Sequence, residues 1–296
     1  MNDHLKGLLI TTAGVLCVVP DSLFVRLIEA PALAIAFWRV ALAGVATGLG
    51  VLLLQGPGPF RALSRSGWLG VVYVVGIGSA GVLFVLAVSL TSIANVVFII
   101  ASLPVFAALF SRIFLAEMLS TRMLLTLAAV LPGLAVIAYG SGETEGARLA
   151  GDLLALSVSA MFAAALTAAR YLRGISMVPG VAVGYLLGAL AISPWAMPLS
   201  VSAEQFPLVF THAGFIAASG ALLAIGPRYI ASAEVGLLVL LESVLAPLLA
   251  WAVIGEDPGR YALLGGAVVL GALGISNLAA LLRPRPARAG LLRNRR

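Results

Sequence analysis

The sequence predicts an all-α integral membrane protein whose ten transmembrane helices form two inverted five-helix repeats. The first observation behind this prediction is composition: 61% of the residues are apolar and only 10% are charged, whereas charged residues make up about 25% of an ordinary globular domain. The second is a series of ten apolar stretches, and the third is an internal repeat. The stretches lack the alternation of a membrane-spanning β-barrel, so helices must pair the backbone amides.

Each apolar stretch is close to twenty residues long, the length that a helix needs to cross about 30 Å of hydrocarbon. The connections between the stretches leave no room for a soluble domain. We therefore divide the chain into a first repeat at 1–145, a second repeat at 146–282 and a basic cytoplasmic tail at 283–296. The first five stretches cover 5–28, 31–54, 67–89, 92–111 and 121–140, and the second five cover 149–172, 178–197, 206–229, 232–255 and 261–282.

The positions of the basic residues predict that both termini are cytoplasmic. With the N-terminus inside, fourteen of the eighteen Lys and Arg residues fall on the cytoplasmic side and three (Arg26, Arg148 and Arg260) fall outside, while Arg39 lies within a stretch. This bias obeys the positive-inside rule. Six of the basic residues belong to the tail, where they orient the chain and contact anionic lipid rather than nucleic acid. The same numbering assigns Asp21 and Glu256 to the outer side.

The internal repeat appears when the sequence is shifted by 139 positions, which places residues 102–117 on residues 241–256 without a gap. Glu117 and Glu256 then coincide at the ends of the two segments. Five helices are an odd number, so the second copy must enter the membrane from the opposite face. Inverted repeats of this kind are common in secondary transporters, whose substrate sites lie near the midplane between the copies.

Each repeat carries an apolar-Pro-apolar sequence that leads to Gly or Ala before Glu. In the first copy this is Leu103-Pro104-Val105 followed by Ala116-Glu117. In the second copy Ser243 takes the place of the proline, and Pro247 follows one turn later. On these residues the chain, from about 5 to 282, resembles the EamA-type ten-helix transporters of the drug/metabolite transporter superfamily. Members of this size are similar to bacterial inner-membrane exporters of amino acids, including aromatic ones.

Two charged residues inside the stretches are the main candidates for substrate binding. Glu242 lies near the bilayer centre, where an acid costs about 2.5–3.5 kcal/mol on insertion scales and normally faces a cavity or a partner. A protonated structural glutamate is the alternative. Arg39 could bind a substrate carboxylate, snorkel to the surface, or pair with Asp152 or Glu242.

Other polar residues join the predicted substrate site with more structural alternatives. His212 coincides with Tyr73 under the 139-residue shift, so both rings could face the transport path, although an interfacial or hydrogen-bonded histidine is the alternative. Asn95 stands near a helix start, where capping is the favoured role. Ser79 and Ser102 could bind a ligand or hydrogen-bond to their own helices.

Three residues are predicted to shape or bend the helices. Gly78 belongs to a GxGxxG sequence at 76–81, but no strand precedes it, so close packing or bending of a helix is expected rather than dinucleotide binding. Pro104 and Pro247 each remove a helical hydrogen bond and are expected to produce kinks that a gate can use.

These observations predict a secondary transporter that exports amino acids or similar amphipathic metabolites by alternating access, with efflux of drugs or quaternary amines as the alternative. No P-loop, HExxH or GxSxG sequence is present, so we expect no enzyme activity, no cofactor and no metal site. A channel is disfavoured because no ring of like charges or filter repeat is visible. The expected partners are a small molecule and the lipid bilayer, and the small-residue faces could also pair two copies of the chain.

Overall fold

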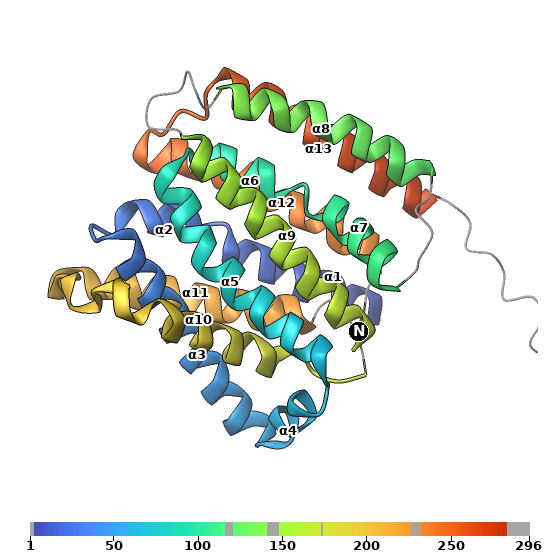
Figure 1. Ribbon diagram of the computed structural model, residues 1–296. Coiled ribbons are helices and arrows are strands. Elements are labelled where there is room, and N and C mark those ends of the chain that lie inside the picture. Colours follow the sequence, from blue (N-terminus) through green and yellow to red (C-terminus); the bar gives the residue numbers. More distant parts are fainter. Residues whose placement is uncertain are drawn as a thin grey trace, which may run out of the picture.

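The computed structural model describes residues 3–115, 121–140, 148–172, 174–225, 229 and 232–282, and every regular element in these ranges is helical (Figure 1). The predicted tail at 283–296 and Glu117 lie outside the described residues. The helices are α1 (Asp3–Val18), α2 (Asp21–Leu27), α3 (Ala32–Gln55), α4 (Gly58–Ser64), α5 (Trp68–Leu90), α6 (Ile93–Ile100), α7 (Leu103–Leu115), α8 (Thr121–Gly140), α9 (Leu149–Tyr171), α10 (Val178–Ala196), α11 (Phe206–Ile225), α12 (Ser232–Ile254) and α13 (Arg260–Leu282), with two short 3₁₀ turns, η1 (Pro198–Ser200) and η2 (Ala203–Gln205).

The lengths of these helices suit a membrane protein. Seven helical segments in the described part of the chain are long and apolar enough to cross a bilayer, and three shorter apolar helices lie at Leu124–Gly140, Leu238–Ile254 and Arg260–Ser276. Large apolar side chains are exposed on the outer surface, among them Leu53 at 84%, Leu54 at 85% and Leu199 at 96%. The all-helical membrane fold is therefore confirmed, while the count of ten spans stays a prediction.

Two of the predicted continuous stretches are broken into two helices, and a proline stands at each break. The stretch at 5–28 divides into α1 and α2, with Pro20 as the residue before α2. The stretch at 92–111 divides into α6 and α7 at Ala101 and Ser102. Pro104 explains this second break, because its ring cannot donate a hydrogen bond to the carbonyl of Ile100 and would clash with it. By contrast, α12 continues through Pro247 without interruption.

The helices pack in pairs that correspond to each other under the 139-residue shift. Helix α5 packs against α9, and their counterparts α11 and α1 pack against each other. Each of α3, α6 and α8 packs against its own counterpart, respectively α10, α12 and α13. A two-fold relation between the halves would produce this pattern. The opposite orientation of the two repeats in the membrane stays a prediction.

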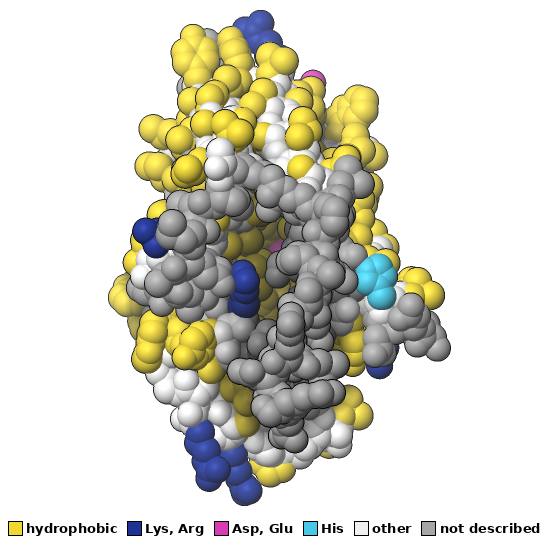
Figure 2. All heavy atoms as spheres, turned by 90° about the vertical axis from the view of Figure 1, so that its right-hand side faces the viewer, with side chains coloured by type: hydrophobic (Ala, Val, Ile, Leu, Met, Phe, Trp, Pro, Cys, Tyr) yellow, Lys and Arg dark blue, Asp and Glu magenta, His cyan; other side chains and the backbone are white. Residues whose placement is uncertain are grey.

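The two ends of the bundle differ. One end carries the N-terminus and α4, and the other carries α2 (Figure 1). The end with the N-terminus faces the viewer in Figure 2, where a central hollow is lined by apolar side chains and an acidic side chain is visible inside it. Farther from the hollow, apolar side chains cover much of the coloured surface, most densely at the top of the view (Figure 2).

Candidate functional site

A cluster of three ionisable side chains from three helices lies inside the bundle. Arg39 of α3 donates from Nε to Oδ1 of Asp21 at 2.9 Å, and its Nη2 forms a second hydrogen bond with Oδ2 of the same carboxylate. His212 of α11 contacts Asp21 Oδ1 through Nε2 at 2.6 Å. The remaining guanidinium nitrogen, Nη1, donates to the carbonyl of Gly81 on α5 at 2.9 Å. Helices α2, α3, α5 and α11 therefore meet at this cluster.

The cluster is almost completely buried. Asp21 and His212 each expose 1% of their surface and Arg39 exposes 5%. Burying charges is costly, and only good geometry with further hydrogen bonds offsets that cost, which is what the paired contacts of Arg39 supply. Aromatic rings enclose the cluster: Phe24 stacks on His212 with centroids 5.3 Å apart, and the Phe84 ring lies 5.3 Å from the Arg39 guanidinium carbon.

Glu242 lies beside this cluster, in the middle of α12. It is near enough to interact electrostatically with Asp21 and Arg39, and it is partly exposed, unlike the three clustered residues. Within the part of the chain that the structure describes, its carboxylate accepts no hydrogen bond. The site therefore holds two acids next to one arginine, and Glu242 is the more exposed of the two acids.

Tyr185 of α10 also lies beside the cluster. It interacts electrostatically with Arg39 and Asp21. Its ring fits between α5 and α11, because a Cβ atom on Gly81 would lie 3.1 Å from the ring and a Cβ atom on Gly220 would lie 3.9 Å from the hydroxyl oxygen. The glycines thus make room for an aromatic hydroxyl beside the charges.

The structure brings Arg39, His212 and Glu242 together, as the predicted substrate site requires. Tyr73 packs against Gly180 in an apolar cluster, and it is near enough to Tyr185 to interact with it electrostatically. Ser79 lies in a shallow groove of about 360 Å³ between α5 and α10, beside Gly78. Whether any of these residues binds a substrate stays a prediction.

Asn95 and Ser102 have the structural partners that their alternative roles require. The backbone amide of Asn95 donates to the Ser92 hydroxyl at 3.2 Å at the start of α6, and the Asn95 side chain donates to Thr91 and Asp152, each at 3.2 Å. The Ser102 hydroxyl donates to the Ile99 carbonyl at 2.6 Å. Asp152 therefore accepts hydrogen bonds from Thr91 and Asn95, and the partner of Arg39 is Asp21.

Of the three residues predicted to bend or shape helices, Gly78 allows close packing. A side chain at Gly78 would collide with the Gly184 backbone of α10, and a Cβ atom on Gly184 would lie 2.6 Å from the Val74 carbonyl oxygen of α5. The backbones of α5 and α10 thus approach each other closely. Pro104 stands at a helix break, and Pro247 stands in an unbroken helix.

Sequence reasoning missed Asp21, Phe24 and Tyr185. The sequence assigned Asp21 to the outer side of the membrane and gave it no role in the site, but the residue is buried and paired with Arg39. Its neighbour Pro20 was the available signal: a proline before an acid inside an apolar stretch indicates a helix break at which a side chain can turn inward. Among the described residues, no group of His, Cys, Asp and Glu is arranged to hold a metal ion.

The comparisons with known proteins agree with this architecture. The model of the EamA-like transporter family matches residues 5–139 and 149–278, which together span nearly the whole chain. The chain belongs to the EamA-like transporter family. It is therefore a multi-pass membrane protein of a transporter family.

A solved structure shares this fold. It is described as "Crystal structure of protein". The superposition covers 94% of this chain and 98% of that chain, with a TM-score of 0.66 and 19% sequence identity. No curated protein matches this EamA-like chain. The family is thus established, and the substrate has to be inferred from the site.

Proposed function

We propose that this protein is a secondary transporter that moves small amphipathic amine-bearing metabolites across the bacterial inner membrane by alternating access. The observation that carries the proposal is Glu242, a partly exposed carboxylate in the middle of a membrane helix beside a neutralised Asp21–Arg39 pair. An ionised acid at this depth is costly without a partner, and the ammonium group of a cargo would supply one.

Amino acids are the first cargo to test, and export is the direction that follows from the resemblance. Their ammonium group would pair with Glu242, and their carboxylate would have to compete with Asp21 for Arg39. That competition is demanding, because Nε and Nη2 of Arg39 bond to Asp21 and Nη1 bonds to Gly81. Aromatic side chains would find Tyr185 and Phe24 nearby.

The same pairing favours quaternary amines as a second class of cargo. A cation without a carboxylate needs only Glu242, and it would leave the Asp21–Arg39 pair intact. The aromatic rings around the cluster suit such a ligand, because their faces attract cations. Drug or quaternary-amine efflux therefore remains the alternative function.

Uptake into liposomes that carry the purified protein tests the proposal. Labelled amino acids and labelled quaternary amines are compared, and preloading with unlabelled cargo should accelerate uptake, as expected of a carrier and not of a channel. Glu242→Gln removes the charge and should reduce uptake of either cargo about tenfold or more, because a cargo cation left without its buried partner costs more than about 1.4 kcal/mol. Glu204→Gln is the matched control, since Glu204 is exposed at the end of the bundle that carries α2. Equal uptake by wild type and Glu242→Gln would exclude Glu242 from the mechanism.

A further inference from the structure

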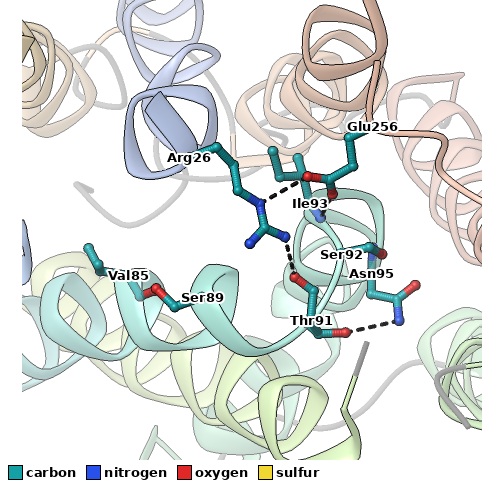
Figure 3. A network of polar contacts seen from close by, with 8 residues as sticks. All are labelled: Arg26, Val85, Ser89, Thr91, Ser92, Ile93, Asn95 and Glu256. Atoms are coloured by element: carbon teal, nitrogen blue, oxygen red, sulfur yellow. Dashed lines mark hydrogen bonds and ion pairs between the residues drawn. The ribbon is translucent and has the colours of Figure 1, made fainter. Parts of the chain in front are cut away.

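A second group of charged residues connects the end of α2 with the start of α6 and with the residue that follows α12 (Figure 3). Arg26, in the last turn of α2, donates from Nε to Glu256 Oε2 at 2.9 Å. Its Nη2 donates to the carbonyl of Thr91, between α5 and α6, at 2.8 Å. Glu256 follows α12, and its Oε1 accepts a hydrogen bond from the backbone amide of Ile93 at 2.6 Å. We refer to these two side chains and their backbone partners as the Arg26–Glu256 gate.

The gate joins parts of both repeats. Arg26 and the corner at Thr91 belong to the first repeat, and Glu256 belongs to the second. Glu256 also satisfies a donor at the start of α6 that has no partner within the helix, and its negative charge suits a helix N-terminus. One carboxylate therefore holds the start of α6 and the end of α2 at the same time.

Neighbouring contacts hold the corner at Thr91 in place. The Thr91 hydroxyl donates to Asp152 of α9 at 2.8 Å, and the backbone amide of Arg148 donates to the Leu90 carbonyl at 3.0 Å. Gly151 permits this contact, because a Cβ atom there would lie 2.7 Å from the Thr91 Cβ atom. At the same end of the bundle, Trp38 donates to the Pro198 carbonyl at 2.9 Å.

The side chains of the gate are accessible to water. Arg26 exposes 29% and Glu256 20% of the side chain, so this ion pair can open at a lower cost than the buried Asp21–Arg39 pair. The hollow of Figure 2 opens at the opposite end of the bundle. The described conformation thus has a hollow at one end and an ion pair that joins the two repeats at the other.

Helix α2 connects the gate with the central cluster. It is only seven residues long and carries Asp21 in its first turn and Arg26 in its last. Between them, Phe24 stacks on His212. The break at Pro20 separates α2 from α1, so the short helix can move as a unit when Asp21 changes partners.

We propose that Arg26 and Glu256 are positioning residues of the transport cycle, forming the gate that closes the pathway at this end, and that α2 transmits the state of Asp21 to them. The proposal rests on the proposed transport function for its role in the cycle, but the gate can be tested without cargo. When Asp21 releases Arg39, α2 shifts, Arg26 leaves Glu256, and this end of the bundle opens.

Cysteine labelling in detergent tests the gate. In a Cys17→Ser background, Ala94→Cys provides a probe beside Ile93, and Ala94 is 2% exposed. Arg26→Gln and Glu256→Gln should each increase the rate at which a water-soluble maleimide labels this probe by about tenfold, because each removes a charge-assisted contact between the repeats. Arg26→Lys retains the charge but only one of the two contacts, so an intermediate rate is expected.

A second probe separates opening from unfolding. Ala168→Cys, in α9, is 1% exposed. Unfolding would expose both probes, whereas opening at the gate should leave labelling at 168 unchanged or slower. Arg260→Gln and Glu204→Gln, which remove exposed charges at the same end, are the matched controls and should leave labelling at 94 unchanged.

Two further results decide the proposal. The Arg26→Gln/Glu256→Gln double variant should accelerate labelling by less than the product of the two single effects, since the two side chains share one ion pair. Asp21→Asn with an intact gate should also accelerate labelling at 94, which tests the role of α2. Unchanged labelling in Arg26→Gln would overturn the gate, and unchanged labelling in Asp21→Asn would overturn the coupling. Neither result would bear on the proposed transport function, which the liposome assay tests separately.

Discussion

The buried pair of Asp21 and Arg39 offers the sharpest prediction about stability. In Asp21→Asn the amide keeps one oxygen as an acceptor, but it places an NH₂ group opposite Nη2 of Arg39, where the native carboxylate accepts a hydrogen bond. Arg39 is 5% exposed and cannot reach bulk water. Removing one partner of a buried ion pair costs about 3–5 kcal/mol, because the remaining charge is left uncompensated.

The double variant Asp21→Asn/Arg39→Gln should be more stable than either single variant. It removes both charges together, so neither charge is left uncompensated, and it leaves two neutral side chains that can hydrogen-bond to each other. We expect a loss of less than about 2 kcal/mol for the double variant, against about 3–5 kcal/mol for each single variant.

Equilibrium unfolding by sodium dodecyl sulfate in mixed micelles, followed by tryptophan fluorescence, measures these differences. Glu204→Gln is the control and should change the free energy of unfolding by less than about 0.5 kcal/mol, because this surface residue lies away from the cluster. Losses in Asp21→Asn and Arg39→Gln that simply add in the double variant would refute the pairing. A loss below about 1 kcal/mol in Asp21→Asn would refute the buried position of the pair.

Two further predictions concern packing and topology. Gly184→Ala should lower the free energy of unfolding by about 1–3 kcal/mol, since its Cβ atom would lie 2.6 Å from the Val74 carbonyl oxygen, whereas Gly50→Ala has open space and should be neutral or stabilising in the same titration. Accessibility mapping of tags should place residues 143–146 and the C-terminal tail in opposite compartments, and a shared compartment would mean that the two repeats are not inverted.

Much of the membrane architecture could be predicted from the sequence. A membrane helix satisfies its own backbone and exposes an apolar surface, so its length and position follow from local hydropathy. This is why the predicted stretch at 31–54 and the observed helix α3 (Ala32–Gln55) differ by a single residue at each end.

The breaks within the helices were less predictable. Pro104 separates α6 from α7, whereas Pro247 stays within α12, because neighbouring helices decide whether a proline interrupts a helix or only bends it.

The candidate site could be predicted only in part. Glu242, Arg39 and His212 were recognisable because ionisable residues inside apolar stretches are rare and costly. The partner of Arg39 was not recognisable, because Asp21 stands near the end of its stretch, where an acid facing water is equally consistent with the pattern. The surroundings of Tyr73 and Ser79 were also hidden, since they depend on the faces that α5 turns toward α10.

The sequence by itself determined that the chain lies in a membrane, that it is helical and that its two halves are related, because each of these properties follows from local composition or from a comparison of the chain with itself. Only the tertiary structure decided that Asp21 pairs with Arg39 and His212, and that Arg26 meets Glu256, residues that lie up to 230 positions apart. The physical reason is that a charge in a low-dielectric interior selects its partner by distance and geometry, which depend on how the helices pack and not on their order in the chain.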